Sequence, residues 1–481
     1  MPFSTLILAA GAGTRMKSTR AKVVHELLGK PMIRWVIDAA QTAGTERILT
    51  VVGHRREQVL PLVGDTTIVV QEERLGTGHA IMVARAELEP YAQAGNSLVV
   101  LSGDTPMLRA DTICELVRKQ QESQAAVCLM AHETDTPSGY GRVVLGGLGQ
   151  VLKVVEDSDA TDEEKLLRLC NSGAYCFDLP KLLENLERLG NANAQGEFYL
   201  TEVFGLLAAA KESVVACIVD AAEAEGVNDR LQLARVSAMM QERINTAWML
   251  QGVTMLEPSS VWIGPNVKLS SDVEILPNVI LSGYTEIEHG CLIGPSSRIV
   301  DSRVGRDCVV DETMIVDSCL EDGVRCGPRA YIRPGTILKL GSKVGTNVEI
   351  KNSTIGVGSK VPHLSYLGDA SLGSDVNIGA GTVTCNFDGT TKYPTQIGDR
   401  AFIGSDTMLV APVKVGADTT VGAGSTITRD VPDGALSLER AEQKVVKDWN
   451  YKKRRKRPES TAAPADKQGA AINPEDKRER Q

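Results

Sequence analysis

The 481-residue chain has few aromatic residues, no paired cysteine motif and no long apolar run. Aromatic residues make up 4% of the chain while glycine occurs 45 times, a balance that suits a repeat protein better than a globule with an aromatic core. None of the ten cysteines forms a C-x-x-C pair, which argues against a zinc or redox motif. Cys128, Cys176, Cys291 and Cys308 fall on strand-like segments, so we expect reduced, buried thiols and a cytoplasmic protein.

Two further absences limit the possible partners. Apolar stretches nowhere reach 18 residues, and the opening residues lack the charged-then-apolar pattern of a secretion signal. We therefore expect neither a membrane span nor a signal peptide. The net charge of −9 disfavours a chain that binds nucleic acid or a membrane surface as a whole. Any anionic ligand must then be bound by locally gathered arginine and lysine side chains.

A six-residue repeat dominates the second half of the chain. An α-helix cannot keep such a stripe on one face, because its turn of about 3.6 residues rotates the stripe away. Short strands joined by tight turns can, with each aliphatic side chain stacked on its equivalent one coil later. We predict a parallel β-helix from about Ile263 to Ile427, with two irregular stretches. Its aliphatic positions are Ile263, Leu269, Ile275, Leu281, Ile287, Ile293 and Ile299, then Ile332, Leu338, Val344 and Ile350, then Ile397, Ile403, Leu409, Val415, Val421 and Ile427.

The first half alternates strand-like and helical segments. This alternation predicts an α/β domain with a parallel sheet, in which ligands bind at the carboxyl ends of the strands. The glycine-rich exit of the first strand and Ser102-Gly103-Asp104, at the exit of a later one, both fall at that edge. The expected strands cover residues 5–10, 48–52, 67–70 and 98–101, and the expected helices run from Pro31 to near Gly44, over 78–88 and over 108–121.

The loop from Gly11 to Arg15 follows the first strand. Backbone N–H groups of such a loop can bind phosphates, because glycine lets the chain approach closely. Met16 stands where a dinucleotide fingerprint has its third glycine, and no Gly-Lys-Ser/Thr follows, so neither that fingerprint nor a P-loop is present. Arg15 and Lys22 are cations suited to a triphosphate. The alternative is that they are only solvated loop charges.

A series of short motifs completes this region and resembles the signature of sugar-nucleotide pyrophosphorylases. Together with the β-helix, it resembles the bacterial bifunctional family that joins N-acetylglucosamine-1-phosphate uridyltransferase to glucosamine-1-phosphate N-acetyltransferase in the synthesis of UDP-N-acetylglucosamine, a precursor of peptidoglycan and lipopolysaccharide. The resemblance covers roughly residues 5–440. The motifs are Leu8-Ala9-Ala10-Gly11-Ala12-Gly13-Thr14-Arg15-Met16 with Lys22, Gln71, Leu75-Gly76-Thr77-Gly78-His79-Ala80, Gly103-Asp104, Gly139-Tyr140-Gly141-Arg142, Glu156, Asn171-Ser172-Gly173, residues 196–201 and residues 225–230.

The resemblance implies a Rossmann-like uridyltransferase domain in residues 1–228. There the phosphate of N-acetylglucosamine-1-phosphate attacks the α-phosphorus of UTP in line, and pyrophosphate leaves. Asp104 and Asn228 would hold Mg²⁺, and Arg15 and Lys22 would stabilise the developing phosphate charge. The implied contacts to UTP and UDP-N-acetylglucosamine are Leu8, Ala9, Ala10, Gly11, Lys22, Ser102, Gly103, Asp104 and Asn228, with Gln71, Gly76 and Thr77 at the uracil and Gly141, Glu156 and Asn171 at the sugar.

The rest of the chain is implied to be a linker helix over residues 229–251 and a left-handed, homotrimeric β-helix over 252–440. His363 would be the general base that deprotonates the amine of glucosamine-1-phosphate before this amine attacks the thioester of acetyl-CoA. By its position alone, His363 could also be a solvated corner residue. The implied contacts to glucosamine-1-phosphate are Arg333, Lys351, Tyr366, Asn377 and Lys392, and those to acetyl-CoA are Ala380, Asn386, Phe387, Ser405, Ala423 and Arg440.

Three residues depart from the family pattern. Ala12 stands where lysine is common, Ser102 where tyrosine is common, and Phe387 where tyrosine is usual. The first two weaken the geometry expected at their positions, and the third removes a hydroxyl contact. None of them removes an implied metal ligand. In the linker helix, the expected apolar positions are Leu231, Leu233, Val236, Met239, Met240, Ile244 and Trp248.

From Tyr451 the chain becomes basic and polar, and we expect residues 441–481 to form a disordered tail with solvated charges, so a nucleic-acid partner is disfavoured. Two alternatives to a bifunctional enzyme remain. The β-helix could only regulate or assemble a pyrophosphorylase, or the whole chain could be a non-catalytic assembly platform. His363 together with Tyr366, Asn377 and Arg440 favours acetyl transfer over the first alternative. Asp104 and Asn228 argue against the second.

Overall fold

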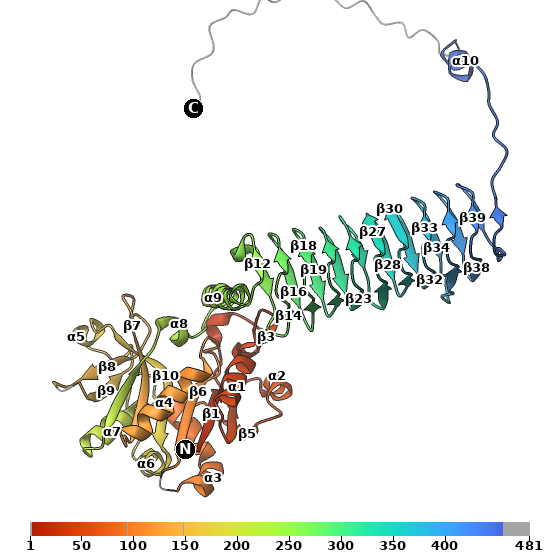
Figure 1. Cartoon of the computed structure of the whole chain (residues 1–481). Coiled ribbons are helices and arrows are strands. Elements are labelled where there is room, and N and C mark those ends of the chain that lie inside the picture. The colour runs from red at the N-terminus through yellow and green to blue at the C-terminus, as the bar shows by residue number, and fades with distance from the viewer. Residues whose placement is uncertain (1, 94, 148, 456–481) are drawn as a thin grey trace, which may run out of the picture. The chain divides into compact units, whose positions relative to one another are not determined.

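The computed structural model describes residues 2–93, 95–147 and 149–455. The chain divides into two compact units, Met1–Leu438 and Glu439–Gln481, each of which is described by itself. Within the first unit, Figure 1 shows an α/β part, a long helix and a stack of short strands. No helix in the described ranges combines the length and the apolar character needed to cross a membrane.

A nine-stranded sheet lies at the centre of the α/β part. It holds all four strands that the sequence predicts in this region. The strands expected over 48–52 and 98–101 are slightly longer, the one over 67–70 is unchanged, and the first runs from Phe3 to Ala9 rather than over 5–10. The strands of the sheet are β1 (Phe3–Ala9), β4 (Arg47–Val52), β5 (Thr67–Val70), β6 (Ser97–Ser102), β7 (Val127–Glu133), β8 (Arg142–Leu145), β9 (Val151–Val155), β10 (Leu169–Asp178) and β11 (Val214–Ile218).

The sheet is mixed rather than parallel. Its main path runs β11-β7-β10-β6-β1-β4-β5, and β8 and β9 form a hairpin beside β10. The pairs β1–β4 and β1–β6 are parallel, as predicted, but β10 is antiparallel to both β6 and β7, so the prediction of a parallel sheet is wrong for this strand. The connection between β7 and β10 forms the antiparallel hairpin β8–β9 instead of the crossover helix that usually joins parallel strands.

Helices cover both faces of the sheet. Side chains of α1 and α4 share a buried cluster with Ile7, and those of α3, α6 and α7 share another with Leu6. Because adjacent strand residues point to opposite faces, the two clusters lie on opposite sides of β1. The elements are α1 (Met32–Thr42), α2 (Arg56–Val59), α3 (Thr77–Leu88), α4 (Ala110–Glu122), α5 (Asp162–Lys165), α6 (Leu179–Leu186), α7 (Glu202–Ala209) and α8 (Ala221–Ala224), the 3-10 turns η1 (Thr14–Met16), η2 (Lys22–Val24), η3 (Leu60–Leu62) and η4 (Glu89–Tyr91), and the hairpin β2 (Glu26–Leu27) with β3 (Lys30–Pro31).

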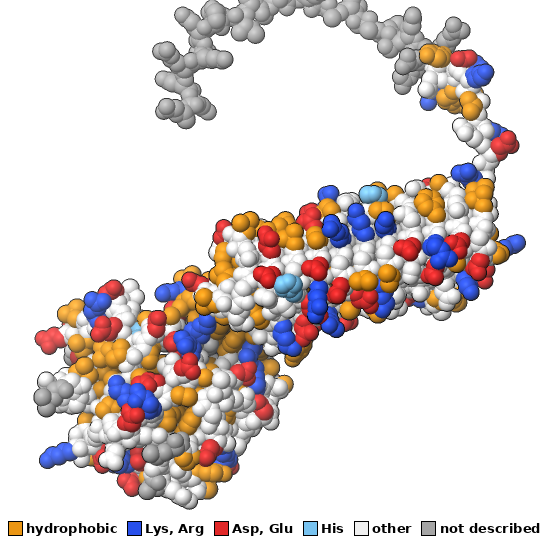
Figure 2. Space-filling view, in the orientation of Figure 1, with side chains coloured by type: hydrophobic (Ala, Val, Ile, Leu, Met, Phe, Trp, Pro, Cys, Tyr) orange, Lys and Arg blue, Asp and Glu red, His pale blue; other side chains and the backbone are white. Residues whose placement is uncertain are grey.

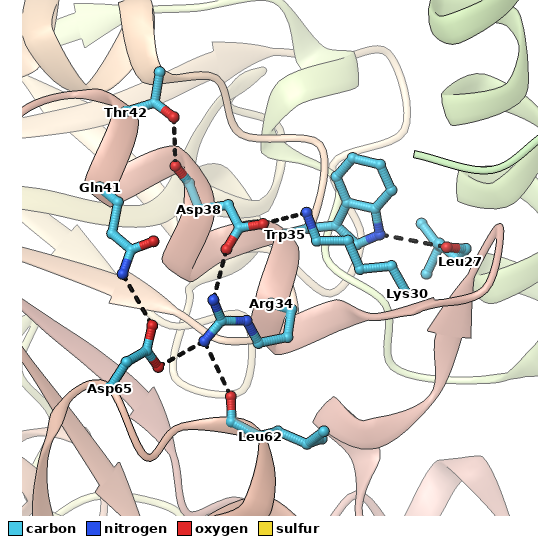
Figure 3. Close-up of polar contacts among 9 residues, drawn as sticks. All are labelled: Leu27, Lys30, Arg34, Trp35, Asp38, Gln41, Thr42, Leu62 and Asp65. Carbon is cyan, nitrogen blue, oxygen red and sulfur yellow. Dashed lines mark hydrogen bonds and ion pairs between the residues drawn. The ribbon is translucent and has the colours of Figure 1, made fainter. Parts of the chain in front are cut away.

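A polar network attaches α1 to its surroundings, as Figure 3 shows. Arg34 donates to Asp65 at 2.7 Å and to Asp38 at 2.9 Å, and Asp38 also forms an ion pair with Lys30. The hydrogen bond from Arg34, together with its charge, holds the pKa of Asp65 below its ordinary value. Since Lys30 lies in the β2–β3 hairpin, which directly follows η2, the network also restrains the segment that carries Lys22.

The second half forms the predicted parallel β-helix, whose three sheets contain eleven, ten and nine strands. The first sheet comprises β12 (Thr254–Met255), β15 (Glu274–Ile275), β18 (Leu292–Ile293), β21 (Val309–Val310), β24 (Arg325–Cys326), β27 (Lys343–Thr346), β30 (Lys360–His363), β33 (Asn377–Ile378), β36 (Phe402–Ile403), β39 (Thr420–Val421) and β41 (Leu436–Ser437). The second comprises β13 (Trp262–Ile263), β16 (Ile280–Ser282), β19 (Arg298–Val300), β22 (Met314–Val316), β25 (Tyr331–Ile332), β28 (Glu349–Lys351), β31 (Tyr366–Gly368), β34 (Val383–Cys385), β37 (Met408–Val410) and β40 (Thr426–Ile427). The third comprises β14 (Lys268–Leu269), β17 (Glu286–Ile287), β20 (Arg303–Val304), β23 (Ser318–Leu320), β26 (Thr336–Leu338), β29 (Thr354–Ile355), β32 (Ala370–Leu372), β35 (Thr395–Ile397) and β38 (Val413–Val415).

The coils continue through the stretches where the six-residue repeat breaks. Ile299 pairs with Ile315 on the next coil, and Ile287 pairs with Val304 on the next coil. All four side chains are buried. Some sides of the coil therefore have five residues rather than six. A search for aliphatic residues at every sixth position does not find these shorter sides. After β34 the chain leaves the coil as a loop, closed by a bridge between Phe387 and Lys392. We call this segment the insertion loop; it lies in the second stretch where the six-residue repeat is irregular.

The long helix α9 (Arg230–Leu250) begins at Asp229, whose carboxylate accepts a hydrogen bond from the backbone of Gln232. Val236 and Met240 are buried, as predicted, but Leu231 is 80% exposed, so its assignment to the apolar face is wrong. The buried face instead contains two amides that the sequence analysis missed. Gln241 and Asn245 both donate to the carbonyl of Val261, at 2.7 and 2.9 Å, and so attach the helix to the first coil, beside the turn η5 (Pro258–Ser260).

The second unit contains the helix α10 (Trp449–Arg455). This helix lies within residues 441–481, which the sequence analysis predicted to form a disordered tail. The remainder of the predicted tail, residues 456–481, lies outside the described residues.

Candidate active sites

The carboxyl ends of β1 and β6 border a cavity of about 610 Å³ in the α/β part. Ten of the predicted nucleotide-binding residues line it. Gly103 lies beside it and donates its backbone N–H to the carbonyl of Leu8 at 2.9 Å. Arg74 and Glu197 also line the cavity, although the sequence analysis did not single them out. The predicted lining residues are Leu8, Ala9, Ala10, Gly11, Lys22, Gln71, Gly76, Thr77, Ser102 and Asp104.

A second cavity, of about 330 Å³, shares Leu8, Thr77, Ser102 and Asp104 with the first. The structure brings all the remaining predicted residues of the α/β part to it, namely Arg15, Gly141, Glu156, Asn171 and Asn228. The sequence analysis missed Tyr140, Ser172, Tyr175, Thr201 and Gln232, of which the first, second and fourth lie inside the quoted motifs. Nothing in the sequence distinguishes Tyr175 or Gln232 from ordinary core and helix residues.

Lys22 stands at the junction of the two cavities. Its ammonium group forms an ion pair with the carboxylate of Asp104 and donates to the side-chain oxygen of Asn228 at 2.7 Å. Arg15 donates to the same Asn228 oxygen at 2.9 Å. Ser102 donates to the other carboxylate oxygen of Asp104 at 2.7 Å. The two implied metal ligands are thus oxygen atoms that converge on one cation, although they come from opposite ends of the α/β part.

The electrostatics of Asp104 favour its ionised form. Burial by itself would raise the pKa of this carboxyl, but the charge of Lys22 and the hydrogen bonds from Lys22 and Ser102 outweigh burial and lower the pKa below its ordinary value. A carboxylate and an amide oxygen suit a hard divalent cation, whose remaining ligands would come from phosphate oxygens and water. Three His, Cys, Asp or Glu residues close enough to hold a metal on their own occur nowhere among the described residues.

The uracil-binding residues predicted in the first cavity form a rigid group. Gln71 is 4% exposed, and its amide nitrogen donates to the carbonyl of Gly76 at 3.1 Å. Gly76 has φ of 103°, and a Cβ atom there would lie 2.6 Å from the carbonyl oxygen of Phe198. Only glycine fits this position. Thr77 accepts a hydrogen bond from the backbone of Leu200 at 3.1 Å, which ties the start of α3 to the segment before α7.

In the second cavity, Glu156 is a largely buried acid. Its carboxylate accepts a hydrogen bond from Thr201 at 2.9 Å, and burial raises its pKa above the ordinary value. Asn171 donates to the hydroxyl of Tyr175 at 2.8 Å. The side chains present both acceptor and donor groups to a polar ligand of sugar size.

Arg142 holds in place two segments that line this cavity. Its guanidinium is 1% exposed, donates to the carbonyl of Tyr140 and to the carboxylate of Asp157 at 3.0 Å, and so joins the start of β8 to the end of β9. Gly141 and Glu156 each lie next to one of these partners. The sequence analysis quoted Arg142 in a motif but gave it no role, and its full burial could not be seen from the sequence.

The β-helix carries the second group of predicted residues. Lys360, Asn377, Phe402 and Thr420 pair successively in the register of β30, β33, β36 and β39. Three residues after each of them stand His363, Ala380, Ser405 and Ala423, which therefore occupy the same corner on successive coils. We call His363, Ala380, Ser405 and Ala423 the corner column. An exposed imidazole stands at one end of this column and small side chains continue it, which fits a long, narrow ligand.

The coils approach one another closely beside this column. A Cβ atom on Gly404 would lie 2.5 Å from the backbone nitrogen of Ala423, and one on Gly379 would lie 2.4 Å from that of Ser405. Glycine is thus required next to the corner column.

Of the predicted phosphate-binding cations, Arg333 directly follows β25, Lys351 ends β28 and Lys392 lies in the loop after β34. Arg333 donates to Glu349 at 2.6 Å, and Glu349 pairs with Tyr366 in the register of β28 and β31. Hydrogen bonding to Lys392 and repulsion by its charge lower the pKa of Lys351 below its ordinary value. Two lysine side chains that close together form a site for an anion.

Asp369, which the sequence analysis missed, organises the insertion loop beside these lysines. Its carboxylate accepts hydrogen bonds from Asn352 and Asn386, both at 2.6 Å. Burial would raise the pKa of Asp369, but these hydrogen bonds and the charges of the neighbouring lysines lower it. The Tyr366 hydroxyl lies against Gly368, where a Cβ atom would be 2.4 Å from it.

Two predicted acetyl-CoA contacts, Phe387 and Arg440, do not belong to the corner column. Phe387 is 57% exposed in the insertion loop. Arg440 belongs to the second unit, so its role at the acetyl-CoA site stays a prediction.

Comparison with known proteins agrees with this two-part organisation. A model of the MobA-like NTP transferase domain matches residues 5–188, and a model of the bacterial transferase hexapeptide, with six repeats, matches residues 394–429. Three relatives are named "Bifunctional protein GlmU". They come from Heliobacterium modesticaldum (46% identical, covering 93% of this chain and 97% of the relative), Fervidobacterium nodosum (47%, 93% and 97%) and Carboxydothermus hydrogenoformans (48%, 92% and 99%).

Proposed function

Because the chain belongs to the family of bifunctional GlmU proteins, it catalyses uridyl transfer and acetyl transfer in UDP-N-acetylglucosamine synthesis, and we propose which residues carry each reaction. Its nucleotidyltransferase domain is followed by a left-handed β-helix of hexapeptide repeats. This membership decides against a β-helix that only regulates and against a non-catalytic platform. We propose domain limits of 1–228, 229–251 and 252–440, with a tail over 441–481. Asp229 at the start of α9 and Gly252, with φ of 96° just after its end, support the two inner limits.

For uridyl transfer, we assign the nucleotide to the larger cavity and the sugar phosphate to the smaller one. Gln71, Gly76 and Thr77 bind the uracil, and the glycine-rich loop after β1 contacts the phosphates through its backbone. Glu156 and Asn171 bind the sugar. The attacking phosphate oxygen then meets the α-phosphorus at the junction of the two cavities, where Arg15 and Lys22 stabilise the charge that develops as pyrophosphate leaves.

We assign a Mg²⁺ site to Asp104 and Asn228. The convergence of their oxygen atoms on the ammonium of Lys22 supports this assignment, because a position that attracts one cation suits another. When bound there, Mg²⁺ would neutralise phosphate charge. Lys22 is then free to turn toward the phosphates.

For acetyl transfer, His363 accepts a proton from the amine of glucosamine-1-phosphate. The nitrogen forms a bond to the thioester carbonyl carbon, the carbon–sulfur bond breaks, and the proton passes to the leaving thiolate of coenzyme A. Arg333, Lys351 and Lys392 bind the sugar phosphate, and Tyr366 and Asn377 orient the sugar. Acetyl-CoA extends from His363 along Ala380, Ser405 and Ala423, with Asn386 and Phe387 beside it.

We further propose a homotrimer assembled through the β-helix and a cytoplasmic location. The family relationship supports the trimer, and the free cysteines, seven of them buried, fit a reducing compartment. UTP and acetyl-CoA are the co-substrates of the two sites.

The observation that carries the assignment is that two separate groups of functional residues lie in two different architectures. It predicts two independent assays. The protein should release pyrophosphate from UTP with N-acetylglucosamine-1-phosphate only when Mg²⁺ is present, and should release free thiol from acetyl-CoA with glucosamine-1-phosphate in the presence of a chelator. Thiol release that requires Mg²⁺ and UTP would contradict the assignment of separate sites.

A further inference from the structure

Three cations stand side by side on the outer surface of the β-helix. Arg325 pairs with Lys343, and Lys343 pairs with Lys360, in the register of β24, β27 and β30. All three are exposed, and no hydrogen bond or ion pair of their side chains is present among the described residues. Since neighbouring strands are about 4.8 Å apart, their charges repel one another. We call Arg325, Lys343 and Lys360 the cation row, and Figure 2 shows Lys and Arg side chains gathered on the β-helix surface.

The cation row differs from several other cations of the β-helix, which form ion pairs with acidic side chains. Neutralising partners do not come from its own column either, because Leu292 and Val309 separate Arg325 from Glu274. An unneutralised row on a chain of net charge −9 creates a local field that attracts anions. Examples of paired cations are Lys268 with Glu286, Arg303 with Glu288, Lys339 with Glu321 and Arg400 with Asp418.

The cation row leads directly to the acetyl-transfer site. The strand residue that pairs with Lys360 on the next coil is Asn377, one of the proposed contacts of glucosamine-1-phosphate. Lys360 also lies in the same strand as His363. From His363, the corner column of Ala380, Ser405 and Ala423 runs toward the C-terminus, whereas the cation row runs toward the N-terminus. The two features therefore extend on opposite sides of the proposed base.

We propose that the cation row guides the phosphate of glucosamine-1-phosphate to the acetyl-transfer site. This inference rests on the proposed acetyl transfer and adds residues that make no contact with the reacting atoms. The row assists the amino-sugar phosphate rather than acetyl-CoA, because the coenzyme occupies the other side of His363. Its contribution is electrostatic and depends on ionic strength. The screening length is about 30 Å at 0.01 M salt but about 3 Å at 1 M, so the effect disappears at high salt.

The test compares two variants of equal net charge. Lys343→Gln/Lys360→Gln removes two charges of the row, and Arg298→Gln/Lys414→Gln removes two exposed charges from other sheets of the β-helix. Thiol release is measured against glucosamine-1-phosphate and, separately, against acetyl-CoA, at 0.02 M and 0.5 M salt. Uridyl transfer, which uses the other domain, reports whether each variant is intact.

The expected result is a fall of about tenfold in kcat/KM for glucosamine-1-phosphate at 0.02 M salt, with kcat unchanged. The fall should shrink to less than about twofold at 0.5 M salt, and kcat/KM for acetyl-CoA should change little. Lys343→Glu/Lys360→Glu should enlarge the effect, and the control variant should not show it. An equal fall at both salt concentrations, an equal fall for acetyl-CoA, or no fall would each overturn the proposal while acetyl transfer by the unmodified protein stands. Absence of thiol release from the unmodified protein would overturn the acetyl-transfer assignment and the row with it.

Discussion

The carboxylate of Asp104 and the side-chain oxygen of Asn228 contact the same ammonium group, that of Lys22. Asp104 follows β6, whereas Asn228 precedes α9, so only the folded sheet brings them together. Because both oxygens contact the ammonium of Lys22, the positions of the three side chains depend on one another. In such a site, each charge depends on the others.

Replacing Asp104 with Asn should weaken metal binding and uridyl transfer. An outer-shell partner of a metal typically contributes a factor of about ten to a hundred in affinity, so loss of a direct carboxylate ligand should cost at least that much. We expect the Mg²⁺ concentration for half-maximal pyrophosphate release to rise at least about tenfold. Mn²⁺ binding followed by electron paramagnetic resonance should weaken in parallel. Asp111→Asn, at an exposed acid of the same domain, should change neither measurement. Unaltered Mn²⁺ affinity in Asp104→Asn would remove Asp104 from the ligand set.

Replacing His363 with Ala should abolish acetyl transfer and spare uridyl transfer. General acid–base catalysis typically contributes a factor of about 10² to 10⁴, and thiol release should fall by that amount. His289→Ala is the matched control, because His289 is another histidine of the β-helix and its Nδ1 lies 3.1 Å from the carbonyl oxygen of Ser271. If both activities of His363→Ala fell together, His363 would be a structural residue.

The periodicity and the motifs of the sequence identified most of the candidate site residues. They did not identify the buried polar residues that hold these site residues in place. The six-residue step of aliphatic residues predicted the β-helix, and the resemblance to a known family pointed to His363. The five-residue sides between Ile299 and Ile332 were hidden, because a five-residue side needs only a shorter turn and leaves no other mark in the sequence. The antiparallel direction of β10 could not be seen either, since it depends on how a hairpin packs.

The supporting polar residues were missed for a related reason. Arg142 and Gln241 are long polar side chains that a sequence reading places on the surface, yet each is buried with hydrogen-bond partners. Burial of such groups is stable only when those partners are present, and the partners come from distant segments. The relation of His363 to Ala423, by contrast, follows from the repeat once the coil register is known.

Replacing Ala423 with Leu should obstruct acetyl-CoA. The corner column depends on small side chains, and fitting extra volume into a packed site typically costs about 1–3 kcal/mol. We expect KM for acetyl-CoA to rise about tenfold or more, with KM for UTP unchanged. Ala417→Leu is a close control, because Val415-Gly416-Ala417 repeats the local motif of Val421-Gly422-Ala423 at a different corner. Equal effects of both substitutions would indicate general damage to the coil rather than a blocked groove.

Replacing Arg142 with Met should destabilise the uridyltransferase domain and weaken sugar binding. Removal of one partner of a buried ion pair typically costs about 3–5 kcal/mol, and the lower end applies here because the Asp157 side chain is 36% exposed. The midpoint of urea unfolding of this domain should fall, and KM for N-acetylglucosamine-1-phosphate should rise. Arg118→Met, at an exposed arginine of α4, should leave both near the values of the unmodified protein. A rise in KM without any loss of stability would mean that Arg142 contacts the ligand rather than supporting the cavity.

Replacing Glu156 with Gln should stabilise the protein at neutral pH while impairing uridyl transfer. Burial raises the pKa of Glu156 in the folded state, so the folded protein is favoured below the unfolded-state pKa of about 4.3, and this advantage is lost as pH rises through the folded-state pKa. A neutral amide of the same shape removes this penalty. The stability gained by Glu156→Gln should therefore be absent near pH 4 and grow toward pH 7, as measured by urea unfolding at each pH. At the same time, KM for N-acetylglucosamine-1-phosphate should rise, because an acceptor for sugar hydroxyls has been weakened. A gain that is the same at pH 4 and pH 7 would show that the ionisation of Glu156 is not its source.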